Sequence, residues 1–246
     1  MLYIYSKFSR HTLDYIFLCL FTLSTFTMLL TNDASILRDS LCGYSDTMCF
    51  YSSNAESINI ILYDLSVGGA ISLIFYALLV RLPALQRRSQ IKRSFRGRYK
   101  NFKISCIEII LLVTNNSYSG GEPEGLLDQK KFRAYFKENA TEDQERWDVF
   151  LNNLCQNEYY LKLLVSHLDV FRDEISYVLN NSSFRDDEVF NFLKRLSEII
   201  YLNRDVDPDF DNLKSLSQFF WQIFAGWSFV DGYSKRDIIE EMIDSI

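Results

Sequence analysis

The stretch INIILYDLSVGGAISLIFYALLV, residues 58–80, decides the fold of this chain. A helix on the surface of a soluble domain shows a polar face about every 3.6 residues, but the segment LIFYALLV at 73–80 shows none. At about 1.5 Å per residue, a helix over 58–80 is long enough to cross roughly 30 Å of hydrocarbon. We therefore predict that this stretch spans a membrane.

A second apolar run lies nearer the N-terminus, at Tyr15–Leu30, and its neighbours extend it to about 13–31. We predict two membrane spans, at about 13–31 and 58–80, joined by an outer loop at 32–57. A cleaved signal peptide over 1–34 is the alternative. It is disfavoured because residues 31–34, TNDA, lack the small-residue pattern of a cleavage site.

The distribution of cations predicts which side of the membrane the two ends occupy. Residues 81–103 contain nine Lys or Arg and no acid, and the N-terminal head carries Lys7 and Arg10. The connecting loop has Arg38 against four acidic residues. Because positive charge favours the cytoplasmic side, we predict a multi-pass protein of the cell inner membrane with both termini cytoplasmic.

The second span carries polar and small residues that have two interpretations. Asp64, Gly68 and Ser72 recur every fourth position, and Ser66 forms a further small-residue pair with Ala70. These residues either line a polar path in an oligomer or serve ordinary helix–helix packing. The expected partners are the lipid bilayer and, by self-association, a second copy of the chain.

The cysteines and histidines indicate a disulfide but no metal site. Cys42 and Cys49 lie in the predicted outer loop at a spacing that a short-loop disulfide allows in an oxidising compartment. Only two histidines occur, and no Cys or His pair has metal-ligand spacing. We predict no metal and no cofactor.

A basic segment at 83–103 follows the second span and is predicted to be a juxtamembrane linker. Such a cluster is attracted to anionic lipid headgroups, and aromatic residues between the cations leave nucleic-acid contact as an alternative. The candidate contact residues are Arg87, Arg88, Lys92, Arg93, Arg96 and Arg98.

The remaining residues, 104–246, carry 26 acidic and 14 basic side chains and show helical periodicity. Helices are predicted at 126–137, from a capping box at Thr141, at 158–179, at 186–203, at 213–229 and from Ser234 to Ile246. Residues 104–113 are apolar and are compatible with either a helix or a strand. The predicted fold is all-α: a two-helix transmembrane hairpin (1–82), the basic linker (83–103) and an acidic cytoplasmic bundle of five or six helices (104–246).

One aromatic segment stands out in the predicted bundle. Phe219, Trp221, Phe224 and Trp227 cover more than one face of a helix. This segment is either the central helix of the bundle or a surface for a partner.

No catalytic motif is visible in the sequence. The phosphate-binding glycine loop, the nucleophile elbow and the zinc-protease helix are all absent. His167 lies in a predicted helix without a catalytic companion. We predict that the protein is not an enzyme.

The layout of the whole chain resembles the two-transmembrane effector proteins of bacterial retron anti-phage systems. The resemblance rests on the basic head, the two spans, the short outer loop, the basic stretch at 81–103, and an acidic helical domain that closes with WQIFAGWSFVDGYSKRDI at 221–238. It implies a toxin kept silent by a reverse transcriptase with its RNA–DNA product, and released during infection to oligomerise and permeabilise the inner membrane. A membrane-anchored adaptor or sensor, whose spans serve only as an anchor, is the alternative function.

Overall fold

The computed structural model describes residues 10–32, 55–182, 184, 186–204, 210–228, 232–234 and 236–246. Most of the predicted outer loop, including Cys42 and Cys49, lies outside the described residues. The described chain is mostly helical, with two small two-stranded sheets, so the predicted all-α class is correct in its dominant content. It divides into two compact units, Met1–Gln86 and Arg87–Ile246, called unit 1 and unit 2 below.

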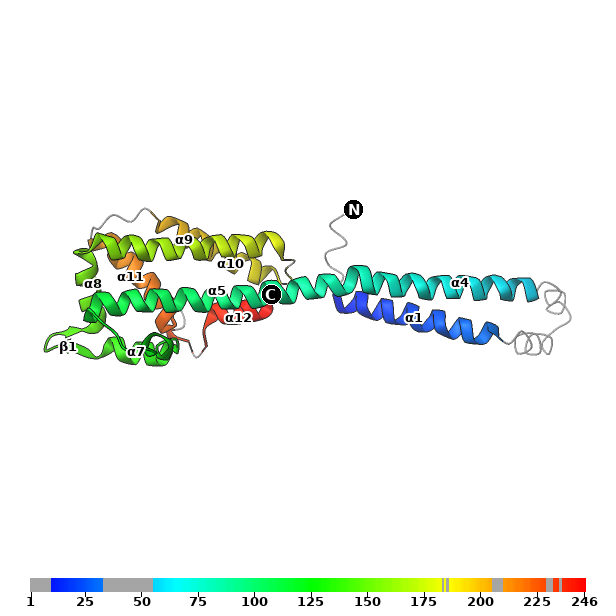
Figure 1. Cartoon of the computed structure of the whole chain (residues 1–246), viewed down its shortest axis with the longest axis horizontal. Helices are drawn as coiled ribbons and strands as arrows, with labels where there is room; N and C mark the ends of the chain where they lie inside the picture. Colours follow the sequence, from blue (N-terminus) through cyan, green and yellow to red (C-terminus); the bar gives the residue numbers. More distant parts are fainter. Residues whose placement is uncertain are drawn as a thin grey trace. The chain divides into compact units, whose positions relative to one another are not determined.

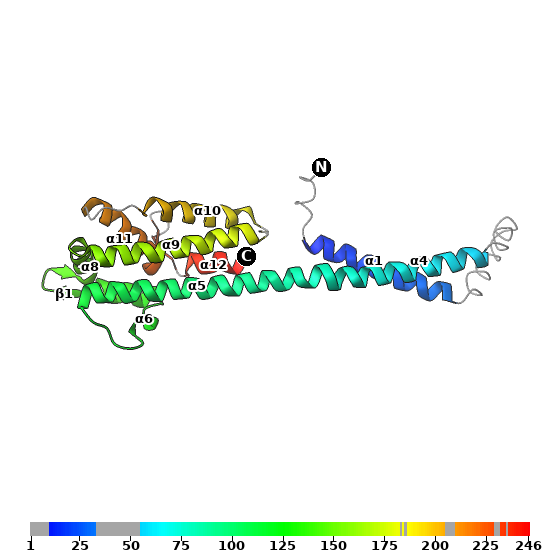
Figure 2. The same cartoon turned by 45° about the horizontal axis from the view of Figure 1, so that its top comes forward.

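Unit 1 contains two helices that lie side by side in Figures 1 and 2. These are α1 (Arg10–Asn32) and α4 (Ala55–Tyr76), and a π-helical turn, η1 (Ala77–Arg81), follows α4. Among the described residues, one helix, Ile60–Asn115, is long and apolar enough to cross a membrane by length and composition. The apolar part of α1, Tyr15–Met28, is a shorter helix.

Unit 2 is built on the long helix α5 (Leu82–Asn115). The other helices are α6 (Glu122–Gly125), α7 (Gln129–Lys137), α8 (Arg146–Cys155), α9 (Glu158–Asn181), α10 (Asp187–Leu202), α11 (Phe210–Ala225) and α12 (Ile238–Ser245). Two antiparallel pairs complete it, β1 (Asn139–Thr141) with β2 (Gln144–Glu145) and β3 (Trp227–Ser228) with β4 (Gly232–Tyr233). The helices outnumber the predicted five or six because α5 and the short α6 join the bundle.

The core of unit 2 is centred on aromatic rings from α5 and α9, which run side by side (Figure 2). The Phe171 ring of α9 stacks on Phe102 with centroids 4.6 Å apart and lies 5.5 Å from the Tyr99 ring and 5.9 Å from the Phe95 ring. All four side chains are buried. A second aromatic cluster joins α7, α8 and α11 through Phe132, Phe136, Trp147, Trp221 and Phe224.

The segment 83–103 is helical and belongs mainly to unit 2, where a linker was expected. The physical reason is a buried apolar row at helical spacing, Ile91, Phe95, Tyr99 and Phe102, on the same helix as the cations. The apolar residues 104–113 continue this helix, which settles the choice between helix and strand.

Two predicted helix starts lie too early in the chain. Thr141 belongs to strand β1, and the next helix begins at Arg146 after the turn between β1 and β2. The terminal helix begins at Ile238, where the Asp237 carboxylate accepts hydrogen bonds from the backbone amides of Ile239 and Glu240. The helices expected at 158–179 and 186–203 are present as α9 and α10.

Candidate functional site

Helix α4 meets α1 through a seam of small polar side chains centred on Ser66. The Ser24 hydroxyl donates to the Ser66 carbonyl oxygen at 2.6 Å, and the Thr27 and Ser66 hydroxyls lie 2.7 Å apart. A side chain on Gly69 would place its Cβ 3.3 Å from the Ser24 Oγ, so glycine permits the close approach here. Ser66 therefore serves packing within one chain.

The other predicted residues of α4 form a separate outward face, which consists of Asp64, Gly68 and Ser72. All three are exposed, and a Cβ added at Gly68 would meet nothing within 4 Å. The Ser72 hydroxyl donates to the Gly68 carbonyl oxygen at 2.8 Å, so its own backbone satisfies it. Large apolar side chains surround this face, including Ile60, Ile61, Leu65, Ile71 and Phe75. One polar and packing face was predicted from the sequence for Asp64, Ser66, Gly68 and Ser72. The structure places Ser66 against α1 and the other three residues away from it.

In unit 2, four cations of α5 form a row that we call the cationic strip: Arg88, Lys92, Arg96 and Lys103. Their spacing of four, four and seven residues places them along one side of the helix. Helix α12 lies against this side in both views (Figures 1 and 2). Arg88 donates to the Ile246 carbonyl oxygen, Lys92 to the Asp244 carbonyl oxygen, and Arg96 to the Asp244 carboxylate. The strip is therefore covered by an acidic helix.

Lys103 is the buried end of the strip. Its side chain is 5% exposed, and its Nζ lies 2.9 Å from Asp237 Oδ2 and 3.0 Å from Glu240 Oε1. The Tyr99 hydroxyl donates to Asp237 Oδ2 at 2.9 Å, and the Lys103 ammonium lies 4.7 Å from the Tyr99 ring centroid. Burial, reinforced by the charge of Asp237, raises the pKa of Tyr99 well above its ordinary value, so the phenol stays protonated as a donor.

The remaining predicted cations lie off the strip. Arg87 donates to the Asn181 side-chain oxygen at 2.9 Å, Arg98 lies 4.0 Å from Glu174, and Arg93 is exposed. Of the six residues expected to contact lipid or nucleic acid, three are thus engaged by α12. The partners of these cations were not predicted from the sequence. The available signal was the acidic row Asp237, Glu240 and Asp244, which has matching helical spacing.

The aromatic segment of α11 supports the core rather than an open surface. Phe219 and Phe224 are buried, and the Trp221 ring lies 4.9 Å from the Trp147 ring. Trp227 belongs to strand β3, because Gly226 adopts a left-handed backbone (φ 65°) that ends α11. The first interpretation, a central bundle helix, applies to three of these four residues.

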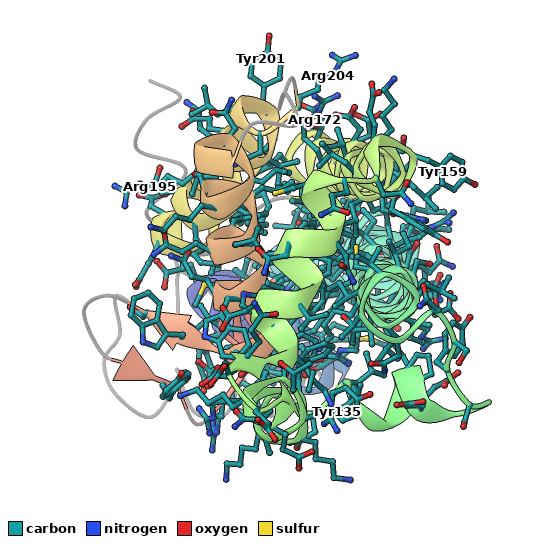
Figure 3. The ribbon with its side chains drawn as sticks, turned by 90° about the vertical axis from the view of Figure 1, so that its left-hand side faces the viewer. Tyr135, Tyr159, Arg172, Arg195, Tyr201 and Arg204 are labelled. Atoms are coloured by element: carbon teal, nitrogen blue, oxygen red, sulfur yellow. The ribbon has the colours of Figure 1, made fainter. Side chains whose placement is uncertain are left out.

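Trp227 lines a cavity of about 390 Å³ between α10, α11, β3 and the start of α12. Its walls are mainly apolar and include Phe192, Ile199 and Ile223, with Asp237 and Arg195 as the charged members. Figure 3 shows Arg195 at the periphery of the domain. The cavity has the size of a small-molecule site but converges few polar groups.

A second charged cluster lies at the end of α10 (Figure 3). Arg172 of α9 contacts Asp169 at 3.1 Å, and Arg204 contacts the same carboxylate at 3.4 Å. The Arg172 guanidinium lies 5.8 Å from the Tyr201 ring centroid. These contacts join α9 to the end of α10.

Within the described part of the chain, the titratable and nucleophilic side chains do not form one catalytic cluster. There, no cluster of three His, Cys, Asp or Glu could hold a metal ion. Burial lowers the pKa of His167 and raises the pKa of the Cys106 thiol well above its ordinary value. Cys106 is therefore a core residue with a protonated, inert thiol.

No family model, curated protein or solved structure matches this chain.

Proposed function

We propose that this protein is a non-enzymatic membrane effector of a bacterial anti-phage system. It self-associates and permeabilises the inner membrane when a cytoplasmic trigger releases it. The observation that carries this proposal is the outward face of α4, where the Asp64 carboxylate stands exposed among apolar side chains.

The exterior of unit 1 supports a membrane location for both of its helices as a transmembrane hairpin. Exposed large apolar side chains cover α1 and α4, including Leu18, Leu23 and Phe26 on α1 and Leu65 and Phe75 on α4. An apolar surface of this extent is unfavourable in water but matches the hydrocarbon of a bilayer. The cations at 81–103 and in the head favour cytoplasmic ends.

The outward face of α4 supports self-association within the bilayer. A carboxylate near the centre of a membrane helix costs about 2.5–3.5 kcal/mol, and α1 contacts the opposite side of α4. A second copy supplies polar partners for Asp64, and Gly68 allows its backbone to come close. Several such faces together line a hydrated path across the membrane, which is the proposed route of permeabilisation.

The trigger is proposed to act on unit 2. The resemblance to retron effectors points to a reverse transcriptase with its RNA–DNA product as the partner that keeps the effector silent. Unit 2 has its own core, which gives such a partner a folded surface to bind.

The test measures growth arrest and entry of a membrane-impermeant dye after overexpression in bacteria. Asp64→Leu and Gly68→Leu should abolish both effects while the amount of protein in the membrane stays constant. The matched control is Leu65→Ile, which changes a neighbouring side chain that is 71% exposed and should leave toxicity intact. Full toxicity of both outward-face variants would contradict the proposed path.

The second candidate, a membrane-anchored adaptor, is favoured by the separate compactness of unit 2. It predicts that an unrelated two-span anchor can replace residues 1–86 without loss of function. Membrane depolarisation by the wild-type chain but not by the anchor-swapped chain distinguishes the effector from the adaptor.

A further inference from the structure

The oxygen acceptors of α12 and the residue after it that meet α5 resemble, in chemistry, the headgroups of an anionic membrane. Asp244 offers its carboxylate to Arg96 and its carbonyl oxygen to Lys92, and Ile246 offers its carbonyl oxygen to Arg88. The phosphate oxygens of a phospholipid present the same acceptor chemistry to Lys and Arg. The acid of α12 that faces elsewhere, Glu241, pairs with Arg236 at 3.7 Å.

The contact between α12 and the cationic strip has a weak end and a strong end. Asp244 is 62% exposed and Arg96 is 51% exposed, so water already competes for this pair. At the other end, Lys103 and Asp237 are 5% and 9% exposed and share Tyr99. Release of Asp244 therefore frees Lys92 and Arg96 while the Lys103–Asp237 pair still holds the start of α12.

The position of the strip in the chain favours lipid as the competing partner. Arg88 follows Arg81, the last residue of η1, by only seven residues in the sequence. We propose that three residues of the cationic strip, Arg88, Lys92 and Arg96, form a binding surface for the phosphates of anionic phospholipids, and that α12 covers them until such lipids displace its C-terminal half. This inference rests on the proposed membrane location of unit 1, but not on permeabilisation.

The test uses the full chain in vesicles of phosphatidylcholine alone and of phosphatidylcholine mixed with phosphatidylglycerol. Hydrogen exchange of the backbone amides in α12 reports whether the helix is docked. In the wild-type chain the anionic vesicles should accelerate this exchange by up to about 25-fold, since each of the two freed cations, Lys92 and Arg96, gains about fivefold near an anionic surface.

Two charge reversals on α12 provide the comparison. Asp244→Lys replaces the acceptor of Arg96 by a like charge and should accelerate exchange in both kinds of vesicle. Glu241→Lys makes the same change of charge on the side that faces Arg236 and should behave as the wild type.

Equal exchange of wild-type α12 in neutral and anionic vesicles would overturn the proposal. Acceleration by added single-stranded RNA but not by anionic lipid would also overturn it, in favour of a nucleic-acid surface. Flotation of the chain with the vesicles distinguishes a failure of the proposed membrane location from a failure of the proposed lipid surface. A chain that does not float contradicts the membrane location, whereas a floating chain with unchanged α12 contradicts only the proposed lipid surface.

Discussion

Replacing Lys103 by Met should destabilise unit 2 by about 3 kcal/mol. The ammonium is 5% exposed and lies within 3.0 Å of both Asp237 and Glu240. Removing one partner of a buried ion pair typically costs about 3–5 kcal/mol, because the other charge stays buried without compensation. We expect the lower end of this range because Asp237 keeps its hydrogen bonds from Tyr99 and two backbone amides, and Glu240 is half-exposed.

Tryptophan fluorescence is a selective assay for this change. The chain contains three Trp, at 147, 221 and 227, and all lie in unit 2, so thermal unfolding of the full chain in detergent can be followed there alone. For a domain of this size, 3 kcal/mol corresponds to a decrease in Tm of about 6–12 °C. Lys162→Met is the matched control, because its pair with Glu158 is exposed to water and should contribute almost nothing to stability.

A double-mutant cycle checks the stated cause. Asp237→Asn keeps a side chain that can cap α12 and removes the negative charge. Combined with Lys103→Met, it should cost about 2 kcal/mol less than the sum of the two single changes. Strict additivity, or a Lys103→Met chain as stable as the wild type, would refute the view that this pair holds α12 on α5.

Three further changes in unit 2 test its packing and its response to pH. Gly226→Ala should destabilise by about 1–3 kcal/mol in chemical denaturation, because the new Cβ would collide with the Gln129 side chain and the backbone has a positive φ there. Gly120→Ala, where the space is open, is the control. Phe171→Ala should cost about 3–5 kcal/mol by the same measurement, since three rings pack against it. Burial lowers the pKa of His167, so the unfolded chain binds that proton more readily, and the free energy of unfolding should fall as the pH drops below about 6.5. His167→Gln should reduce that fall in a comparison of unfolding at neutral and mildly acidic pH.

Helices whose apolar residues recur on one face could be predicted from the sequence, and α9 is the clearest case. Leu161, Leu164, Leu168, Phe171 and Ile175 were expected on one face and are buried. The segment 83–103 was misjudged because its cations dominated the composition. The apolar row within it has the same helical spacing. It decided the structure because one face of the helix buries the large rings while the intervening charges stay at the surface and keep their solvation.

The contacts within the candidate sites could not be predicted from the pattern of a single segment. The polar residues of α4 were identified from the sequence, but the periodicity of one helix does not show which of its faces packs against the neighbouring helix. Ser66 contacts α1 and Asp64 does not. The pairing of Arg96 with Asp244 joins residues 148 positions apart, and nothing near either residue specifies the other. Such a contact depends on the way the whole of unit 2 folds.

The separation of Arg96 and Asp244 in the sequence affects what happens while the protein is synthesised. A ribosome adding about 5–20 residues per second completes Arg96 some 7–30 s before it reaches Asp244. Throughout this interval the nascent chain carries the cations of α5 without their acidic cover. In the proposed orientation, this is also when the preceding helices enter the bilayer, so the charges that fix orientation are available to the anionic leaflet during insertion and become neutralised by α12 only afterwards.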